Sequence, residues 1–265
     1  MDHDEHRSNL LDSFPNGLGA VVQGSSRGIG LALVARLLEE PGLGRVMACA
    51  RAPDSSEGLI QLLDRHEERL ILQPLDVTDP LSIEAAADAA VYRGLRPHLV
   101  INVAGILHEG TALGPEKRLE DIDLAALERV FAVNVLGPAV FMRHFLPRMA
   151  TDGKAVFAAL SARVGSIGDN RLGGWYAYRA SKSALNQTLK TASIEARRRF
   201  KNIIVAALHP GTTDTSLSAP FQANVDPEKL FAPEFVAERL LRVLGQLQPE
   251  DSGGFFAWDG QSIPW

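Results

Sequence analysis

The stretch that decides the fold is GAVVQGSSRGIG, residues 19–30. Its first five residues form an apolar run of strand length, and the residues from Gly30 to Glu40 have the apolar spacing of a helix. The glycines between them allow a tight turn and leave the first N–H groups of the helix open to an anion. A strand, a glycine turn and a helix in this order predict a dinucleotide-binding α/β unit.

Apolar runs and helical patterns continue to alternate along the rest of the chain. Further runs of strand length lie at 45–50, 69–75, 99–103, 155–160, 203–208 and 255–258, and helical patterns lie at 59–66, 80–92, 124–149, 178–200 and 235–247. Parallel strands need crossover helices, and strands that are buried on both faces are apolar throughout. The sequence therefore predicts one doubly wound α/β Rossmann domain over residues 18–265, with a seven-stranded, mostly parallel sheet and helices on both faces. Residues 1–17 are predicted to be a flexible tail.

The composition excludes several classes of protein. The 265 residues carry 27 Lys and Arg against 32 Asp and Glu, a net charge of −5, which argues against nucleic acid as a partner. Cys49 is the single cysteine, so we expect no disulfide and no cysteine-based metal site, and we predict no metal. Charged residues interrupt the apolar runs, and the acidic start lacks the order of a signal peptide. We therefore expect a cytoplasmic protein that does not contact a membrane.

Four further motifs follow the glycine turn along the chain. They are Asp76-Val77, Asn102-Val-Ala-Gly105, Tyr178-x-x-x-Lys182 and Pro210-Gly211. With these motifs in this order, the chain resembles the short-chain dehydrogenases/reductases from about residue 19 to its end. Gln23 stands where that family usually has Thr, which changes how the turn is braced. The loop at 165–177 and the final residues, 253–265, resemble the branch that includes the C-factor signalling protein and sniffer-type carbonyl reductases.

The resemblance implies that a nicotinamide dinucleotide binds along these motifs. Arg51 follows the second strand, at a place where an NAD-binding protein of this fold normally has Asp or Glu. Arg51 and Arg27 together suit a 2′-phosphate, so NADP(H) is predicted in preference to NAD(H). Thr215 is the candidate hydroxyl for the nicotinamide carboxamide. The predicted cofactor-binding residues are Gly24, Ser26, Arg27, Gly28, Ile29, Gly30, Arg51, Asp76, Val77, Asn102, Ala104, Gly105, Tyr178, Lys182, Pro210, Gly211, Thr213 and Thr215.

The candidate catalytic pair is Tyr178 and Lys182, which project from the same face of a helix because they are four residues apart. A lysine ammonium beside a phenol favours the phenolate, so we expect it to lower the pKa of Tyr178 from the usual ~10. The resemblance implies that Tyr178 is the proton donor and that Lys182 also holds the nicotinamide ribose. It further implies that Asn134 holds a water that connects the lysine to solvent. An unpaired asparagine inside an apolar helix is unfavourable, which supports such a role.

The resemblance also implies a serine that positions the substrate carbonyl, and here the sequence leaves alternatives open. The stretch is Leu160-Ser161-Ala162-Arg-Val-Gly165-Ser166, and counting back from Gly165 places Ala162 at the usual register. Either Ser161 faces the site, or Ser166 substitutes for it from the loop, or no serine takes part. A slip of one residue turns a strand side chain to the opposite face. We predict Ser161.

These features together predict an NADPH-dependent reductase of a ketone, aldehyde or quinone. The alternative is an NADP(H)-binding signalling or interaction protein of the same fold with little turnover. Residues 216–224 are the expected substrate lid, a loop that excludes water from the site. The resemblance implies a homodimer or homotetramer that pairs the helices at 124–149 and 178–200, with a monomer as the alternative. The sequence identifies neither the substrate nor the direction of the reaction.

Overall fold

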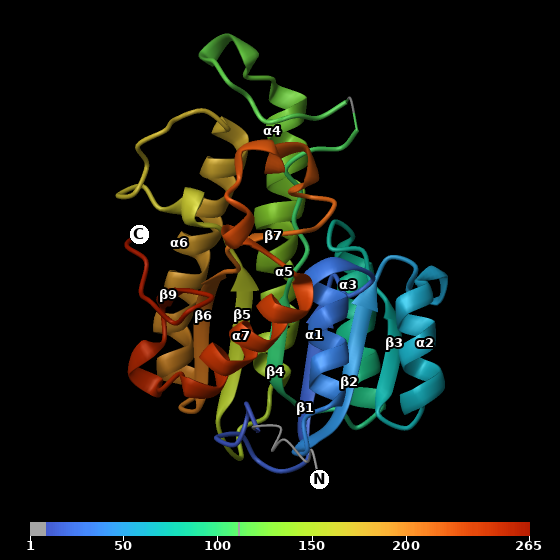
Figure 1. Cartoon of the computed structure of the whole chain (residues 1–265). Coiled ribbons are helices and arrows are strands. Elements are labelled where there is room, and N and C mark those ends of the chain that lie inside the picture. Colours follow the sequence, from blue (N-terminus) through green and yellow to red (C-terminus); the bar gives the residue numbers. More distant parts are fainter. Residues whose placement is uncertain (1–8, 111) are drawn as a thin grey trace, which may run out of the picture.

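The computed structural model describes residues 9–110 and 112–265, which form a seven-stranded parallel sheet between two layers of helices (Figure 1). The strand order is β3-β2-β1-β4-β5-β6-β9, and all six pairs of neighbouring strands in this sheet are parallel. The strands are β1 (Leu18–Gln23), β2 (Leu43–Ala50), β3 (Leu70–Pro74), β4 (Pro97–Asn102), β5 (Ala155–Leu160), β6 (Ile203–His209) and β9 (Gly254–Ala257). The predicted Rossmann fold and the predicted strand count are confirmed.

Helices cover both faces of the sheet, as the continuously apolar strands predict. One face carries α1 (Gly28–Leu38), α2 (Glu57–His66) and α7 (Pro233–Gln246), and the other carries α3 (Pro80–Tyr92), α4 (Leu124–Phe131), α5 (Gly137–Phe145) and α6 (Tyr176–Arg199). Their buried side chains form one apolar core on each face of the sheet. The strand order reverses between β1 and β4, so a crevice opens there at the carboxyl edge of the sheet.

The turn between β1 and α1 requires its glycines for steric reasons. Gly24 and Gly28 have φ of +85° and +54°, a region that side chains rarely tolerate. A Cβ on Gly30 would lie 2.1 Å from the carbonyl oxygen of Gly24, so the helix and the turn could not pack together. The glycine spacing therefore encodes the close approach of α1 to β1.

The stretch predicted as one helix at 124–149 is interrupted by a π-helical turn. After α4, residues Ala132–Leu136 form this turn, and the chain continues as α5. By length and mean hydropathy (1.5), Leu124–Arg148 has the composition of a membrane span, because its most apolar window holds no more than two charged residues. Arg143 interrupts this stretch, as the sequence leads us to expect of the apolar runs. In the fold, α5 packs on α3 and buries Phe141 and Phe145 in the core.

The prediction of a flexible tail that reaches residue 17 is wrong for residues 9–17. Leu10, Leu11 and Phe14 are buried in the core beside α1 and α7. The Ser13 hydroxyl donates a hydrogen bond to the carbonyl of Gly245 at 2.7 Å. Three buried apolar side chains compensate for the entropy lost when this short segment is ordered. Residues 1–8 of the predicted tail lie outside the described residues.

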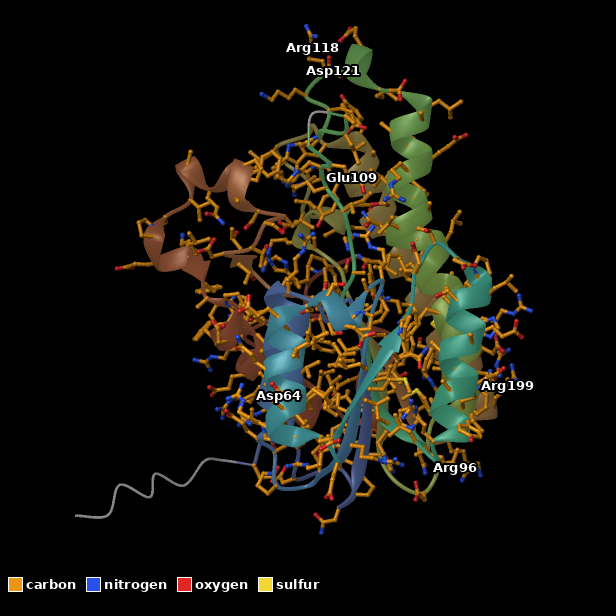
Figure 2. The ribbon with its side chains drawn as sticks, turned by 90° about the vertical axis from the view of Figure 1, so that its right-hand side faces the viewer. Asp64, Arg96, Glu109, Arg118, Asp121 and Arg199 are labelled. Atoms are coloured by element: carbon orange, nitrogen blue, oxygen red, sulfur yellow. The ribbon has the colours of Figure 1, made fainter. Side chains whose placement is uncertain are left out.

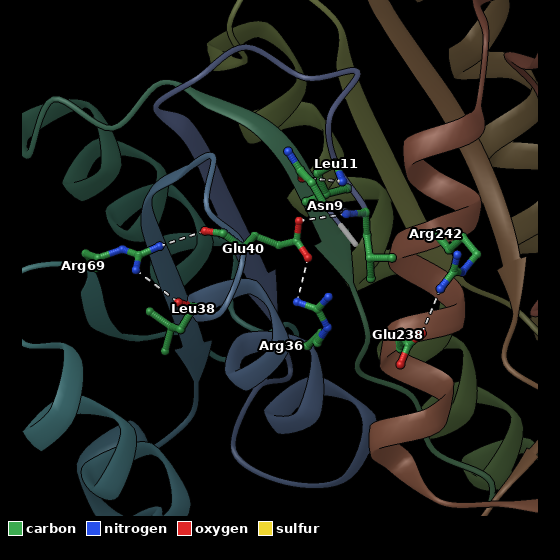
Figure 3. A network of polar contacts seen from close by, with 9 residues as sticks. Asn9, Leu11, Arg36, Leu38, Glu40, Arg69, Glu238 and Arg242 are labelled. Atoms are coloured by element: carbon green, nitrogen blue, oxygen red, sulfur yellow. Dashed lines mark hydrogen bonds and ion pairs between the residues drawn. The ribbon is translucent and has the colours of Figure 1, made fainter. Parts of the chain in front are cut away.

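A buried carboxylate fixes this segment to the end of α1 (Figure 3). Glu40 is 1% exposed, and its Oε2 accepts a hydrogen bond from the Leu10 N–H at 3.0 Å. Its Oε1 forms an ion pair with Arg36 at 2.6 Å. Arg69 binds the carbonyls of Leu38 and Glu40 at 3.1 and 3.2 Å. The charge on Glu40 is thus paired and hydrogen-bonded, which is the condition for burying a carboxylate without a large cost.

Candidate active site

A cleft of about 740 Å³ opens at the carboxyl edge of the sheet. Its walls come from the residues that directly follow β1, β2, β3, β4, β5 and β6, together with parts of α4 and α6. The lining includes Gly24, Ser26, Arg27, Gly28, Ile29, Arg51, Asp76, Val77, Ala104, Gly105, Ser161, Tyr178, Lys182, Pro210 and Thr215, all of which the sequence predicts. The predicted residues Gly30, Asn102, Asn134, Gly211 and Thr213 lie outside this lining.

The dinucleotide end of the cleft is built around the open N-terminus of α1. Arg27 is the N-cap residue, and the structure shows no side-chain cap there and no acidic residue in the first turn. The first N–H groups of the helix and its dipole therefore point at the cleft without a partner from the described residues. A Cβ on Gly24 would lie 2.7 Å from the backbone nitrogen of Ala104. The arrangement fits a pyrophosphate held by backbone N–H groups.

Positive charge gathers beside this end of the cleft. Arg27 and Arg51 are both exposed, and within the described part of the chain neither guanidinium makes a hydrogen bond or salt bridge. Asp76 accepts hydrogen bonds at its Oδ1 from the N–H and hydroxyl of Thr78, at 2.8 and 2.7 Å. Partial burial acts to raise the pKa of Asp76, but the bonds from Thr78 and the charges of Arg51 and Arg129 hold it below the usual value. Asp76 is therefore ionised at neutral pH.

Gln23, which stands where the family usually has Thr, braces the turn from inside. It is 3% exposed, and its Oε1 accepts hydrogen bonds from Asn102 Nδ2 at 2.8 Å and from the Ala104 N–H at 3.3 Å. One side chain thus connects the ends of β1 and β4 across the crevice. Asn102 uses its amide for this bond, so its role in the structure is to support the turn.

The predicted catalytic pair lies together in the cleft. Tyr178 and Lys182 are 8% and 3% exposed and both line the cavity. Lys182 Nζ donates to the carbonyl of Leu160 at 2.8 Å and lies 5.7 Å from the centroid of the Tyr178 ring. A Cβ on Gly105 would lie 3.3 Å from Lys182 Nζ, so a glycine leaves room for the ammonium group.

Burial is the main cause of the pKa shifts of Tyr178 and Lys182. It lowers the pKa of Lys182 to about 8 and raises the pKa of Tyr178 above that of a free tyrosine. The expected lowering of the Tyr178 pKa by the lysine charge is therefore wrong for this structure, because burial of the phenol raises its pKa. At neutral pH the phenol keeps its proton, which is the form that a proton donor needs.

Asn134 lies within the π-helical turn, is fully buried, and connects two elements. Its Oδ1 accepts from the Ile106 N–H at 2.8 Å, and its Nδ2 donates to the Ile106 carbonyl at 2.9 Å and to Ser181 Oγ at 3.1 Å. A Cβ on Gly105 would lie 3.3 Å from its Oδ1. The π turn is thus held at the point where α4 and α5 meet the end of β4, beside Lys182.

Of the three serine alternatives, Ser161 is the one whose geometry fits a site residue. Ser161 follows β5, lines the cleft and is 3% exposed. Its Oγ has no hydrogen-bond partner among the described residues, which is unusual for a buried hydroxyl. Ser166 Oγ accepts from the Asp169 N–H at 3.1 Å and lies outside the lining. Ala162 caps a short 3₁₀ turn at Arg163–Gly165 and also lies outside it.

The segment expected to be the lid contributes two residues to the lining of the cleft. The short strands β7 (Thr212–Thr213) and β8 (Leu230–Phe231) pair with each other and hold the two ends of this segment together. Ser216 and Leu217 line the cleft, and both of their carbonyls lie within 3.2 Å of His108 Nε2. Because a carbonyl only accepts, Nε2 carries the proton and donates to both.

Several lining residues were missed by the sequence reasoning. Arg129 on α4 and Glu109 form a two-pronged salt bridge, with bonds of 2.8 and 2.6 Å, and both line the cleft. Figure 2 shows Glu109 on the segment between β4 and α4, below Arg118 and Asp121 at its tip. No motif marks this segment, although His108 and Glu109 follow closely after the Asn102–Gly105 motif. The sequence signal that could have identified these residues is their position after the end of a parallel strand.

The sequence profile of the short chain dehydrogenase family matches residues 19–226. The chain belongs to this family. Two relatives illustrate the match. The chain is 33% identical to an uncharacterised oxidoreductase of Schizosaccharomyces pombe over 256 residues, which cover 92% of this chain and 96% of the relative. It is 35% identical to the C-signal of Myxococcus xanthus over 167 residues, which cover 63% of this chain and 92% of the relative.

Solved structures of the family share the fold. The NADPH-bound carbonyl reductase from chicken fatty liver superposes with a TM-score of 0.83 at 31% identity, over 93% of this chain and 98% of the other. The carbonyl reductase Sniffer of D. melanogaster gives a TM-score of 0.81 at 23% identity, over 95% and 100% of the two chains. The resemblance to this family is therefore confirmed, and the likeness to the C-signal and to the fold of Sniffer agrees with the assigned branch.

Proposed function

We propose that this member of the family is an NADPH-dependent reductase of a ketone, aldehyde or quinone. The observation that carries the proposal is the convergence of three groups in one cleft. They are a protonated, buried Tyr178, the ammonium of Lys182 and the unpartnered hydroxyl of Ser161. A carbonyl oxygen that gains negative charge during reduction needs such donors around it.

The cofactor assignment rests on charge and on steric fit. The open N-terminus of α1 and the glycine turn suit a pyrophosphate, and Arg27 and Arg51 suit a 2′-phosphate. The similar carbonyl reductase from chicken fatty liver is described as bound to NADPH, at 31% identity, which supports the same preference here. When bound, NADPH supplies the hydride that reduces the carbonyl carbon.

The chain's own residues would do the remaining work. Ser161 Oγ, as a free donor beside β5, would hold the substrate oxygen in place. Tyr178 would give its phenolic proton to that oxygen, and the charge of Lys182 would stabilise the phenolate that is left. Asn134, hydrogen-bonded to Ile106 and Ser181, would keep the π turn in the position that leaves space for the lysine. The lid would exclude water during the transfer.

The first experiment is a fluorescence titration of the purified protein with NADPH and with NADH, in the absence of substrate. We expect NADPH to bind at least about tenfold more tightly, because two charge-assisted contacts to the 2′-phosphate are lost with NADH. Changing Arg27 and Arg51 together to Ala should remove this preference. Arg65→Ala, a change on the outer face of α2, is the matched control. A preference for NADH in the unaltered protein would contradict the assignment.

The second experiment tests the proton donor and the serine. With a panel of 4-nitrobenzaldehyde, acetophenone and menadione, Tyr178→Phe should lower kcat by about 10²-fold or more and leave the Kd of NADPH within about threefold. Ser161→Ala should lower kcat by about tenfold or more, and Ser166→Ala should change it by less than about threefold. Full turnover in Tyr178→Phe would remove that residue from the mechanism, and a larger effect at Ser166 would move the serine role to the loop.

The alternative function is a nucleotide-binding signalling protein with little turnover. The likeness to the C-signal of Myxococcus xanthus is the observation that favours it. Tight binding of NADPH without turnover of any carbonyl in the panel would favour this alternative. Measurable turnover that Tyr178→Phe abolishes would favour the reductase.

A further inference from the structure

The helix that carries Tyr178 begins without a cap of its own. Trp175 is the N-cap residue of α6, and its backbone is left-handed, with φ of 54° and ψ of 47°. Its side chain makes no capping hydrogen bond, and the first turn of the helix holds no acidic residue. The first N–H groups of a helix have no intrahelical acceptor, so a buried helix start needs an acceptor from elsewhere.

Glu116, from the segment between β4 and α4, supplies that acceptor. Its Oε1 and Oε2 lie 3.3 and 3.1 Å from the backbone nitrogen of Ala177, which donates to the carboxylate. Its backbone carbonyl accepts from the Trp175 N–H at 2.5 Å. Glu116 is 5% exposed, and no cation of the described residues forms a salt bridge with it. The positive end of the helix dipole is therefore the compensating charge for this buried carboxylate.

The contact of Glu116 reaches the catalytic residue through one turn of backbone. Ala177, which Glu116 caps, directly precedes Tyr178 and packs against Leu113 and Val130. Trp175, which Glu116 also holds, packs edge-on against the Tyr178 ring, with ring centroids 6.2 Å apart. Any fraying of this first turn would rotate the phenol away from the cleft.

The same contact reaches the lid. The ring of Trp175 lies 5.1 Å, centroid to centroid, from that of Phe221, which belongs to the short helix Ala219–Asn224 of the lid. The left-handed backbone at Trp175 directs the indole between the phenol and the lid. A bulky residue rarely adopts φ above zero unless its surroundings hold it there, and the Glu116 carbonyl is one such restraint.

We propose that Glu116 is a positioning residue for Tyr178. Its carboxylate fixes the first turn of α6 at Ala177. Its backbone carbonyl holds Trp175, whose ring packs between those of Tyr178 and Phe221. Glu116 lies outside the lining of the cleft, so it acts on the reaction only through the helix and the indole. This inference rests on the proposed role of Tyr178 as the proton donor.

The test compares Glu116→Ala and Glu116→Gln with Glu120→Gln. Glu120 lies four residues further along the same segment, is exposed, and makes no hydrogen bond shown within the described part of the chain. With 4-nitrobenzaldehyde, we expect Glu116→Ala to lower kcat by about 10- to 100-fold while the Kd of NADPH stays within about threefold. Glu116→Gln keeps one acceptor oxygen and should recover kcat to within about fivefold of the unaltered protein. Glu120→Gln should change kcat by less than about twofold.

A readout that does not depend on turnover accompanies the kinetics. Hydrogen–deuterium exchange should be faster at the backbone amides of residues 175–178 in Glu116→Ala, while the peptides of β1 and α1 keep their protection. An unchanged kcat in Glu116→Ala, or a Gln variant no better than the Ala variant, would overturn the proposal. So would a loss of NADPH binding in parallel with kcat, because that would indicate general unfolding.

The exchange readout also separates this inference from the proposed function. If Tyr178→Phe keeps full turnover, the role of Tyr178 fails, whatever the Glu116 variants do. If Tyr178→Phe is inactive and amide exchange at residues 175–178 is the same in Glu116→Ala as in the unaltered protein, the proposed function stands and the inference about Glu116 fails.

Discussion

Among the single residues of the cleft, Lys182 is one whose pKa the fold changes by burial. Its spacing from Tyr178 was predictable, because a four-residue separation on a helix fixes the shared face. The change in the lysine pKa was not predictable from the sequence. It depends on how far β5 and Gly105 shield the ammonium group from water, and both lie far from Lys182 in the sequence. With its pKa lowered to about 8, Lys182 is mostly charged at pH 7 and loses its proton as the pH rises through about 8.

This pKa predicts the pH dependence of the reaction. The charged form exists below about pH 8 and is lost as the pH rises, so kcat/KM for NADPH-dependent reduction should be level at lower pH and fall above about 8. The measurement is an initial-rate profile from pH 6 to 10, with the panel carbonyl that turns over fastest. Lys182→Arg keeps its charge through this range and should lack the falling limb, at a lower absolute rate. The same limb in the Arg variant would assign the pKa to another group.

At the scale of elements, the sequence predicted the strands and helices well and their interruptions poorly. The limits of α3 and β5 were predicted correctly, because Asp79 caps the first and apolar residues end with the second. The π turn at Ala132–Leu136 was not visible, since one extra residue in an already apolar stretch leaves no mark on its periodicity. Local pattern also could not decide whether Ser161 or Ala162 faces the cleft, because both follow a strand that is apolar throughout.

His108 connects the segment that follows β4 to the lid, and these two loops share no sequence motif. Its Nε2 bonds to the carbonyls of Ser216 and Leu217, and its ring lies edge-on to Phe221 at 5.8 Å. We expect His108→Ala to loosen the lid, so that NADPH dissociates about 3- to 30-fold faster, as measured by stopped-flow displacement. His66→Ala, on α2, is the control. An unchanged dissociation rate would show that the lid does not depend on His108.

In the whole molecule, the N-terminal segment that stabilises the fold and the cleft of the candidate active site lie at opposite ends of the sheet. Residues 9–17, dark blue in Figure 1, pack near the amino ends of the strands, whereas the residues that line the cleft follow the carboxyl ends of the strands. The sequence reasoning missed this packing because three apolar side chains in nine residues form neither a strand nor a helix pattern. Tertiary contacts with α7 and with the end of α1 give the segment its place.

Phe14→Ala tests this separation. Phe14 is 6% exposed and also lies under the ammonium of Lys154, 4.9 Å from its ring centroid. We expect the free energy of unfolding to fall by about 3 kcal/mol, since a buried ring is lost, with the Kd of NADPH unchanged within about twofold. Urea unfolding and NADPH titration measure the two quantities. Asp12→Ala, at an exposed neighbour, is the control. An equal loss of NADPH affinity would contradict the separation.

Trp175 is placed to report on the lid through its intrinsic fluorescence. Of the three tryptophans, Trp258 packs against Phe231 and against Phe235 of α7, and Trp265 stacks on Phe255 of β9. The indole of Trp175 instead lies between the phenol of Tyr178 and the lid. A form of the protein with Trp258 and Trp265 replaced by Phe would emit from that single place. Its intrinsic fluorescence would then follow lid opening in real time, without a dye or a labelled substrate.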